Sequence, residues 1–144
     1  MRVLLDTNVV LDALLGREPW KDDADAILQA SRESKFSAYV TSLSVANLFY
    51  IRRRLMGLEK AQSGVRQCLD GFEILPVDRR ILEAAIAMPS SDFEDNIQMV
   101  AAVEAALDAV VTRNPADFAA CTLPVLTPQL LLAKLADEVN ANNP

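Results

Sequence analysis

Three aspartates stand where apolar segments of the sequence end or begin, and they are the residues most suited to chemistry. Asp6 follows the apolar residues 2–5, Asp95 opens an alanine-rich segment, and Asp117 lies in the loop after residues 109–112. Two carboxylates about 4 Å apart repel by about 4 kcal/mol at an effective dielectric constant of about 20, so a cluster of the three must share a proton or bind a cation. Oxygen ligands of this kind favour Mg²⁺ or Mn²⁺, which activates water and offsets phosphoryl charge when phosphate esters are hydrolysed.

The chain contains no histidine, and this narrows the chemistry further. It excludes Ser-His and Cys-His nucleophilic pairs, imidazole bases and histidine metal sites. The net charge of −6 has the wrong sign for binding nucleic acid by bulk charge, so any such contact must be local. The basic residues considered for contact with a phosphate backbone are Arg52, Arg53, Arg54 and Arg113, although a basic run such as the first three is also typical of a solvated helix face.

Length and composition indicate one ordinary globular domain. The chain has 144 residues, of which 51% are hydrophobic and 24% charged, and we expect a single domain over residues 1–138 with a frayed tail at 139–144. Two well-separated cysteines, Cys68 and Cys121, and a strand-like start without a leader predict a reduced, cytoplasmic protein. The longest apolar runs are shorter than the ~20 residues that span a bilayer, so no membrane partner is expected.

Alternating strand-like and helical segments predict how the aspartates are positioned. Helical patterns separate five apolar segments, which are residues 2–5, 36–41, 72–77, 109–112 and 125–126. This order predicts an α/β fold with a mostly parallel sheet of four to five strands. Sites in such folds lie outside the carboxyl ends of the strands. Polar residues follow several of these ends, among them Asp6, residues 41–47, Asp78, Thr112, Asn114 and Asp117.

Structural roles compete with functional ones at several of these positions. Asp78 is interpreted as a helix cap, and of the two acids Asp92 and Asp95 one is expected to cap the helix and the other to act as a ligand. Asn8 is expected to form a turn and to hydrogen-bond Asp6. For Asp12, in the middle of an apolar helix, both a contact behind the site and exposure to solvent stay open.

The ordered set of motifs resembles the PIN domain, in the branch related to VapC-type toxins. The resemblance rests on the run 6–8 (Asp-Thr-Asn) after the opening strand, on Asp95, and on residues 112–114 and 117–118 after the fourth strand, and it extends over residues 1–135. It implies a three-layer α/β/α fold and a ribonuclease that depends on Mg²⁺ or Mn²⁺. It also implies an RNA substrate, an antitoxin protein that blocks the site, and a homodimer.

Carried over to this sequence, the resemblance assigns the catalytic and metal-binding roles to Asp6, Asp95 and Asp117. The polar residues expected to support them are Asn8, Asn47, Asp92, Thr112 and Asn114. Many PIN domains have a glutamate where this chain has Asn47, and an amide can neither carry charge nor accept a proton as a carboxylate does. Two alternatives follow. Either Asp92 or Glu94 compensates, or the protein is a weak or inactive module that binds RNA or a partner.

A phosphatase of the haloacid dehalogenase class is a further alternative, because the residues after the first strand also resemble its nucleophilic aspartate loop. That loop needs a second aspartate where Asn8 stands. The phosphatase also needs a later lysine, and the only lysine after Lys60 is Lys134 in the last expected helix.

Overall fold

A five-stranded parallel sheet forms the centre of residues 1–143, the part of the chain that this computed structural model describes. The strand order is β3-β2-β1-β4-β5, and every neighbouring pair is parallel. In the register, Leu4 stands opposite Tyr39 on one side and Val110 on the other. The strands are β1 (Arg2–Leu5), β2 (Ser37–Thr41), β3 (Glu73–Leu75), β4 (Ala109–Val111) and β5 (Val125–Leu126).

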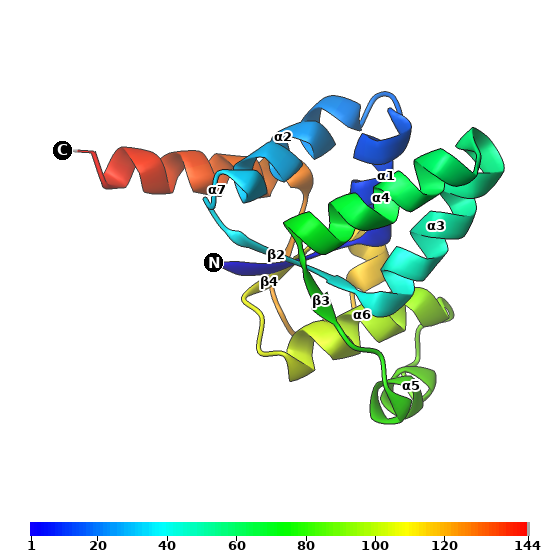
Figure 1. The fold of residues 1–144 in the computed structure, drawn as a ribbon. Helices are drawn as coiled ribbons and strands as arrows, with labels where there is room; N and C mark the ends of the chain where they lie inside the picture. The colour runs from blue at the N-terminus through cyan, green and yellow to red at the C-terminus, as the bar shows by residue number, and fades with distance from the viewer. Residues whose placement is uncertain (144) are drawn as a thin grey trace.

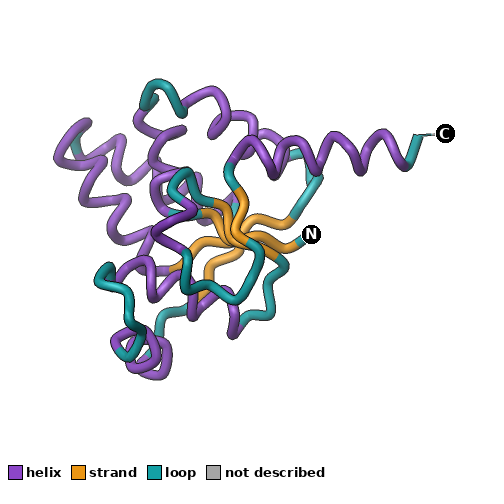
Figure 2. Tube along the Cα trace, turned by 180° about the vertical axis from the view of Figure 1, so that it is seen from behind, coloured by secondary structure: helices purple, strands orange, loops and turns teal. Residues whose placement is uncertain are grey.

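Helices cover both faces of the sheet and produce the expected three-layer α/β/α architecture (Figures 1 and 2). One face carries α1 (Thr7–Leu15), α2 (Lys21–Arg32), α3 (Ser42–Met56), α4 (Leu58–Gly71) and α7 (Pro128–Ala141). The opposite face carries α5 (Arg79–Ile86) and α6 (Phe93–Glu104). A short 3₁₀ helix, η1 (Pro115–Phe118), follows β4.

The central strand β1 explains why the chain needs helices on both faces. Val3 and Leu5 point into the core beneath α1, α2 and α7, whereas Leu4 points to the other side and packs with Met99 of α6. These three side chains of β1 are completely buried. A strand that is apolar on both faces must be covered on both, which is the usual condition of a parallel sheet.

Local side-chain chemistry sets several element boundaries and corrects some expected ones. Thr41 caps α3 by accepting a hydrogen bond from the amide of Ser44 (3.0 Å), so this helix begins at Ser42. The third strand ends before Pro76, which has no amide hydrogen for the ladder, and the amide of Val77 donates to the hydroxyl of Ser42 instead (3.1 Å). The strand is therefore shorter than the predicted 72–77.

Helix caps elsewhere agree with the sequence. The side chain of Asp78 accepts from the amide of Ile81, and that of Asp92 accepts from the amide of Asp95. Asp92 is thus the cap of α6, which leaves the carboxylate of Asp95 for other contacts. The helix α7 runs to Ala141 and so includes the first three residues of the expected tail, 139–141. None of the helices described over residues 1–143 is long and apolar enough to cross a membrane.

Candidate active site

The sheet reverses its winding between β1 and β4, and the candidate site lies at that point. The chain leaves β1 toward β2 on one side, whereas β4 lies on the other side of β1. Open α/β sheets bind ligands outside the carboxyl ends of the two strands at such a switch. Asp6 directly follows β1 and Thr112 directly follows β4, and the amide of Asp6 donates to the carbonyl of Val111 (2.9 Å).

Asp6 is held by hydrogen bonds from two other elements. Its side chain is almost completely buried, with 3% exposed. Its Oδ1 accepts from Nε2 of Gln98 on α6 (3.1 Å), and its Oδ2 accepts from the hydroxyl of Thr112 (2.9 Å). Burial raises the pKa of Asp6, and these two donors act in the opposite direction. Although Asp6 directly precedes α1, its side chain makes no capping hydrogen bond to that helix.

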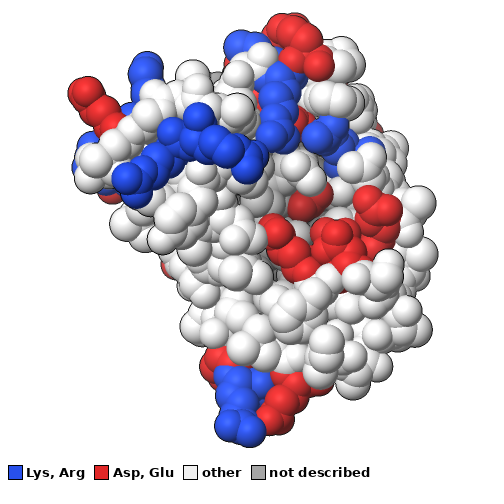
Figure 3. All heavy atoms as spheres, turned by 90° about the vertical axis from the view of Figure 1, so that its right-hand side faces the viewer, with Lys and Arg blue, Asp and Glu red and all other residues white. Residues whose placement is uncertain are grey.

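The carboxyl of Asp95 shows that the acids converge. Burial is the largest cause that raises its pKa, to about 7, and repulsion from Asp92, Asp6, Asp117 and then Glu94 adds to it. These side chains come from the ends of β1, α6 and η1, which are far apart in sequence. Acidic side chains gather in a hollow of the surface, and a band of Lys and Arg side chains lies along one rim of it (Figure 3).

Glu94, one of the two acids considered as a replacement for the missing glutamate, contacts Asn47. Its Oε1 accepts from the hydroxyl of Thr7 (2.7 Å), and its Oε2 accepts from Nδ2 of Asn47 (2.8 Å). The hydroxyl of Ser44 lies 2.6 Å from that of Thr7 and continues this hydrogen-bonded chain below the site. Asn47, the residue at the expected glutamate position on α3, therefore binds and orients a glutamate that α6 supplies.

Gln98 is a functional neighbour that the sequence analysis missed. Gln98 is buried and bridges the site, since its Nε2 donates to Asp6 while its Oε1 accepts from the amide of Thr7 (3.2 Å). One signal could have revealed it. Gln98 follows Asp95 by three residues and Glu94 by four, and side chains at these spacings share a helix face.

A second buried aspartate lies close to the first. Asp12 of α1 is 1% exposed, with its Oδ2 3.2 Å from Nε of Arg113 and its Oδ1 3.7 Å from Nη1 of Arg17. The exposed alternative for Asp12 was therefore wrong. The guanidinium of Arg17 also donates to Oδ1 of Asn8 (3.4 Å), which links this ion-pair cluster to the start of α1. The side chain of Asn8 is thus bound to Arg17, whereas the sequence analysis expected Asn8 to hydrogen-bond Asp6.

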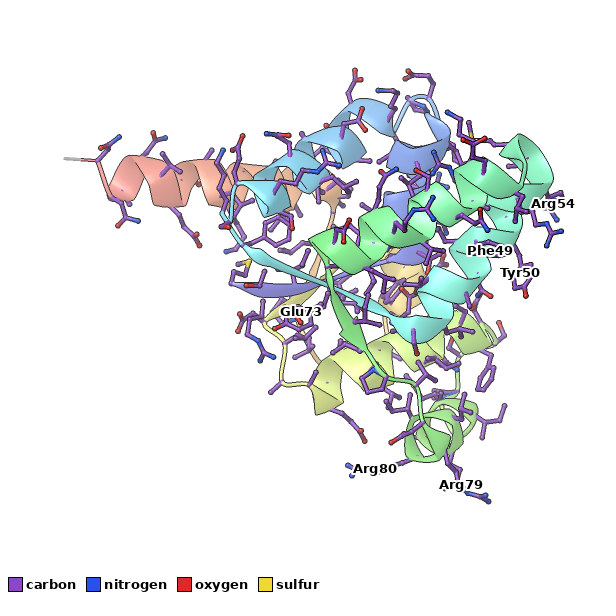
Figure 4. The ribbon with its side chains drawn as sticks, viewed as in Figure 1. Phe49, Tyr50, Arg54, Glu73, Arg79 and Arg80 are labelled. Carbon is purple, nitrogen blue, oxygen red and sulfur yellow. The ribbon has the colours of Figure 1, made fainter. Side chains whose placement is uncertain are left out.

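The three consecutive arginines of α3 differ in their surroundings. Arg52 is buried, its Nη1 donates to the carbonyl of Lys60 on α4 (2.8 Å), and it packs against Gly64. Its selection as an RNA contact was wrong, because an inward-facing guanidinium bound to backbone is not available to a phosphate. Arg53 and Arg54 are exposed, and Arg54 projects outward from the end of α3 (Figure 4). No ion pair involves either one within residues 1–143.

The remaining predicted residues border the cluster. Asp117 is exposed on η1 and contributes to the repulsion felt by Asp95. Asn114 is exposed as well, and its backbone amide donates to the hydroxyl of Thr112 (3.1 Å). Its side chain is therefore at the rim of the site, and its backbone helps to hold Thr112 in place.

The donor set fits a hard divalent cation in its chemistry. Asp6, Asp95 and Asp117 offer oxygen ligands, and the repulsion among them is relieved by positive charge. As the side chains stand, no three acidic or sulfur-bearing groups among residues 1–143 are spaced to ligate one ion. Asp6 is held in place by its hydrogen bonds, whereas Asp95 is half-buried and Asp117 exposed.

The family model described as PIN domain matches residues 2–116 of the chain. This protein belongs to the PIN domain family. Family membership replaces the phosphatase alternative considered from the sequence. Asp6, Asn47 and Asp95 lie within the matched residues, and Asp117 lies directly after them. None of the curated proteins compared with the chain matches it.

Solved structures share this PIN fold. A chain of the DNA-bound VapBC from Salmonella typhimurium has a TM-score of 0.67 and 16% identity, with 89% of this chain and 98% of that chain covered. FitAcB from Neisseria gonorrhoeae has a TM-score of 0.63 and 23% identity, with 88% and 98% covered. VapC20 from Mycobacterium tuberculosis, a sarcin-ricin loop cleaving toxin, has a TM-score of 0.62 and 10% identity, with 75% and 86% covered. At these identities the likeness establishes the fold.

Proposed function

We propose that this PIN domain is an endoribonuclease that depends on Mg²⁺ or Mn²⁺ and hydrolyses RNA phosphodiester bonds. The observation that supports the proposal is that Asp6 and Asp117 both repel the carboxyl of Asp95 beside the switch point of the sheet. The chain has no histidine to serve as a general base. A divalent cation bound by these carboxylates would lower the pKa of water and offset negative charge on the phosphate.

Other residues of the chain position the metal ligands and contact the RNA in this proposal. Gln98 and Thr112 fix the carboxylate of Asp6, so this ligand is positioned before a cation arrives. Asp95 must lose its proton to act as a ligand, because its pKa is near 7. We further propose that Glu94, held by Thr7 and Asn47, supplies the fourth carboxylate that α3 lacks. The exposed guanidinium groups of Arg53 and Arg54 are the proposed contacts to the RNA backbone.

The biological setting is part of the proposal. Likeness to chains of VapBC and FitAcB supports a role as the toxin of a toxin-antitoxin pair, with an antitoxin protein that blocks the acidic site. A basic antitoxin segment would complement an acidic hollow in a chain of net charge −6. The family resemblance adds a homodimer, and the pattern of cysteines in the sequence adds a cytoplasmic location. Sedimentation analysis and cell fractionation would test these two expectations.

Calorimetric titration with Mn²⁺ tests the site without a guess about the substrate. We expect wild-type protein to bind Mn²⁺ and the Asp6→Asn variant to bind it at least about a hundredfold more weakly, since a ligand that two donors hold in place is lost. Metal-dependent cleavage of RNA by the wild type but not by this variant would complete the case. Equal heats for the two proteins would contradict the proposal.

A module that binds RNA or a protein without cleaving is the second candidate, and Asn47 is the observation that favours it. The same titration separates the two functions. Binding of RNA or of an antitoxin together with no cleavage at any Mn²⁺ or Mg²⁺ concentration would support the module. Cleavage would exclude it.

A further inference from the structure

The side chain of Trp20 is unusually exposed to solvent for a tryptophan. It is the only tryptophan of the chain, it lies in the turn between α1 and α2, and 39% of it is exposed. The guanidinium of Arg113 lies over its ring, with Cζ 3.7 Å from the ring centroid. One face of the indole is therefore supported by a cation, while a large part of the side chain remains accessible.

The guanidinium of Arg113 that lies over the indole is held in place by a buried carboxylate. Nε of Arg113 lies 3.2 Å from Oδ2 of Asp12, whose side chain is 2% exposed. Arg17 approaches the other oxygen of Asp12 (3.7 Å), and its backbone carbonyl accepts the amide of Trp20 (3.1 Å). The ring and its guanidinium neighbour are thus anchored to the same buried carboxylate.

The Trp20–Arg113 stack is next to the acidic cluster. Arg113 directly follows Thr112, whose hydroxyl donates to Asp6, and the charge of Arg113 is among the influences that lower the pKa of Asp6. A planar group stacked on Trp20 would therefore lie near the carboxylates that are proposed to act on a phosphodiester.

We propose that Trp20, backed by Arg113, is a stacking platform for an unpaired base of the RNA substrate. This inference rests on the proposed ribonuclease function and adds a residue that contacts the substrate. Every base offers a π face, but only a base outside a duplex exposes one, so the platform selects single-stranded or looped RNA with little preference for sequence. Arg113 adds positive charge near the backbone in an otherwise acidic site.

The single tryptophan provides a direct measurement in the full-length protein. The Asp6→Asn variant, in which cleavage is blocked, is titrated with a short oligouridylate and with an oligomer of the same length that lacks bases. We expect the uridylate to quench the emission of Trp20 and the abasic oligomer to leave it unchanged. Trp20→Leu in the same background should weaken uridylate binding about tenfold, whereas Trp20→Phe, which keeps an aromatic face, should lose clearly less.

The outcomes separate this inference from the proposed function. If wild-type protein cleaves RNA but bound uridylate leaves the emission unchanged, or if both oligomers quench it equally, the stacking platform is refuted and the ribonuclease stands. If RNA is neither bound nor cleaved, both proposals fall. A duplex of the same length that binds and quenches as strongly as the single strand would also overturn the inference. Circular dichroism of the Trp20 variants establishes that they remain folded.

Discussion

Asp6 precedes α1 and Asp12 lies within it, and these two buried aspartates differ in the partners of their carboxylates. Asp12 is paired with two arginines, Arg17 and Arg113. Asp6 is held by the uncharged donors of Gln98 and Thr112 and is repelled by Asp95. Burial raises the pKa of both carboxyls. The fold therefore supplies guanidinium partners for Asp12, whereas the partners of Asp6 are mainly neutral.

This difference separates a structural role from a functional one. A buried carboxylate that has its own guanidinium partners stabilises the folded chain without any ligand, because the charge is already compensated. A carboxylate surrounded by further acids is strained until a proton or a cation arrives. The second arrangement is typical of active sites, where charges are placed for a ligand and not for the fold.

The largest expected effect is on the free energy of unfolding, when the charge of Asp12 or of Asp6 is removed. Asp12→Asn should lower the free energy of unfolding by about 2 kcal/mol, since two partly buried arginines lose their partner. Asp6→Asn should change it by less than about 1 kcal/mol without metal, because relief of repulsion offsets a weakened hydrogen bond. Urea denaturation in the presence of a chelator measures both. Equal losses would erase the proposed distinction between the two aspartates.

Proton competition at Asp95 should make cation binding depend on pH. In the unfolded chain this carboxyl has a pKa near 3.8, and in the folded protein it is about 7. Folding therefore favours its protonated form, so stability falls as the pH rises from about 4 to about 7. A cation must displace that proton, and Mg²⁺ affinity should rise about tenfold between pH 6 and pH 8.

The control for this pH dependence is Asp95→Asn, which cannot titrate at this position. Its Mg²⁺ affinity should be weaker throughout and nearly constant over the same pH range. Carboxyl ¹³C chemical shifts would follow the titration of Asp95 directly. An Asp95 signal that titrates near pH 4 without metal would contradict the repulsion inferred for the cluster.

Glu94 tests whether the acidic region extends to a fourth carboxylate. Glu94→Gln should weaken Mn²⁺ binding about tenfold, as expected for a residue at or next to a metal ligand. Asp92→Asn is the matched control on the same turn of α6, because asparagine caps a helix as well as aspartate does. We expect less than about a threefold change for the control. Similar losses for both variants would show that only total charge matters.

The smallest effect concerns the arginines that lack an acidic partner. Arg54→Ala should leave stability nearly unchanged and reduce the salt dependence of RNA binding by about one unit of slope. Arg52→Ala should instead destabilise the hairpin of α3 and α4, since Arg52 is buried there against the carbonyl of Lys60. Thermal unfolding and salt-dependent binding distinguish them. A loss of RNA binding without a loss of stability in Arg52→Ala would reverse this assignment.

The architecture was largely predictable, because it depends on patterns that are local in the chain. The fully apolar residues 3–5 and 109–111 indicate strands buried on both faces, and Gly16 ends α1 with the left-handed backbone that a glycine stop suggests. Boundaries were less certain where a side chain decides them. Both Thr41 and Ser44 suit a helix start, and only the contact between them shows that Thr41 is the cap.

The sequence by itself determined the parallel α/β order and the presence of acids after the first and fourth strands, since periodicity and residue type need no knowledge of distant contacts. Tertiary structure alone decided which partners these acids have. Gln98 reaches Asp6 across 92 positions, Glu94 reaches Asn47 across 47, and Arg52 turns inward while Arg54 turns outward. The physical reason is that the energy of a buried charge is set by its neighbours in space, and packing brings those neighbours from elements far apart in the chain.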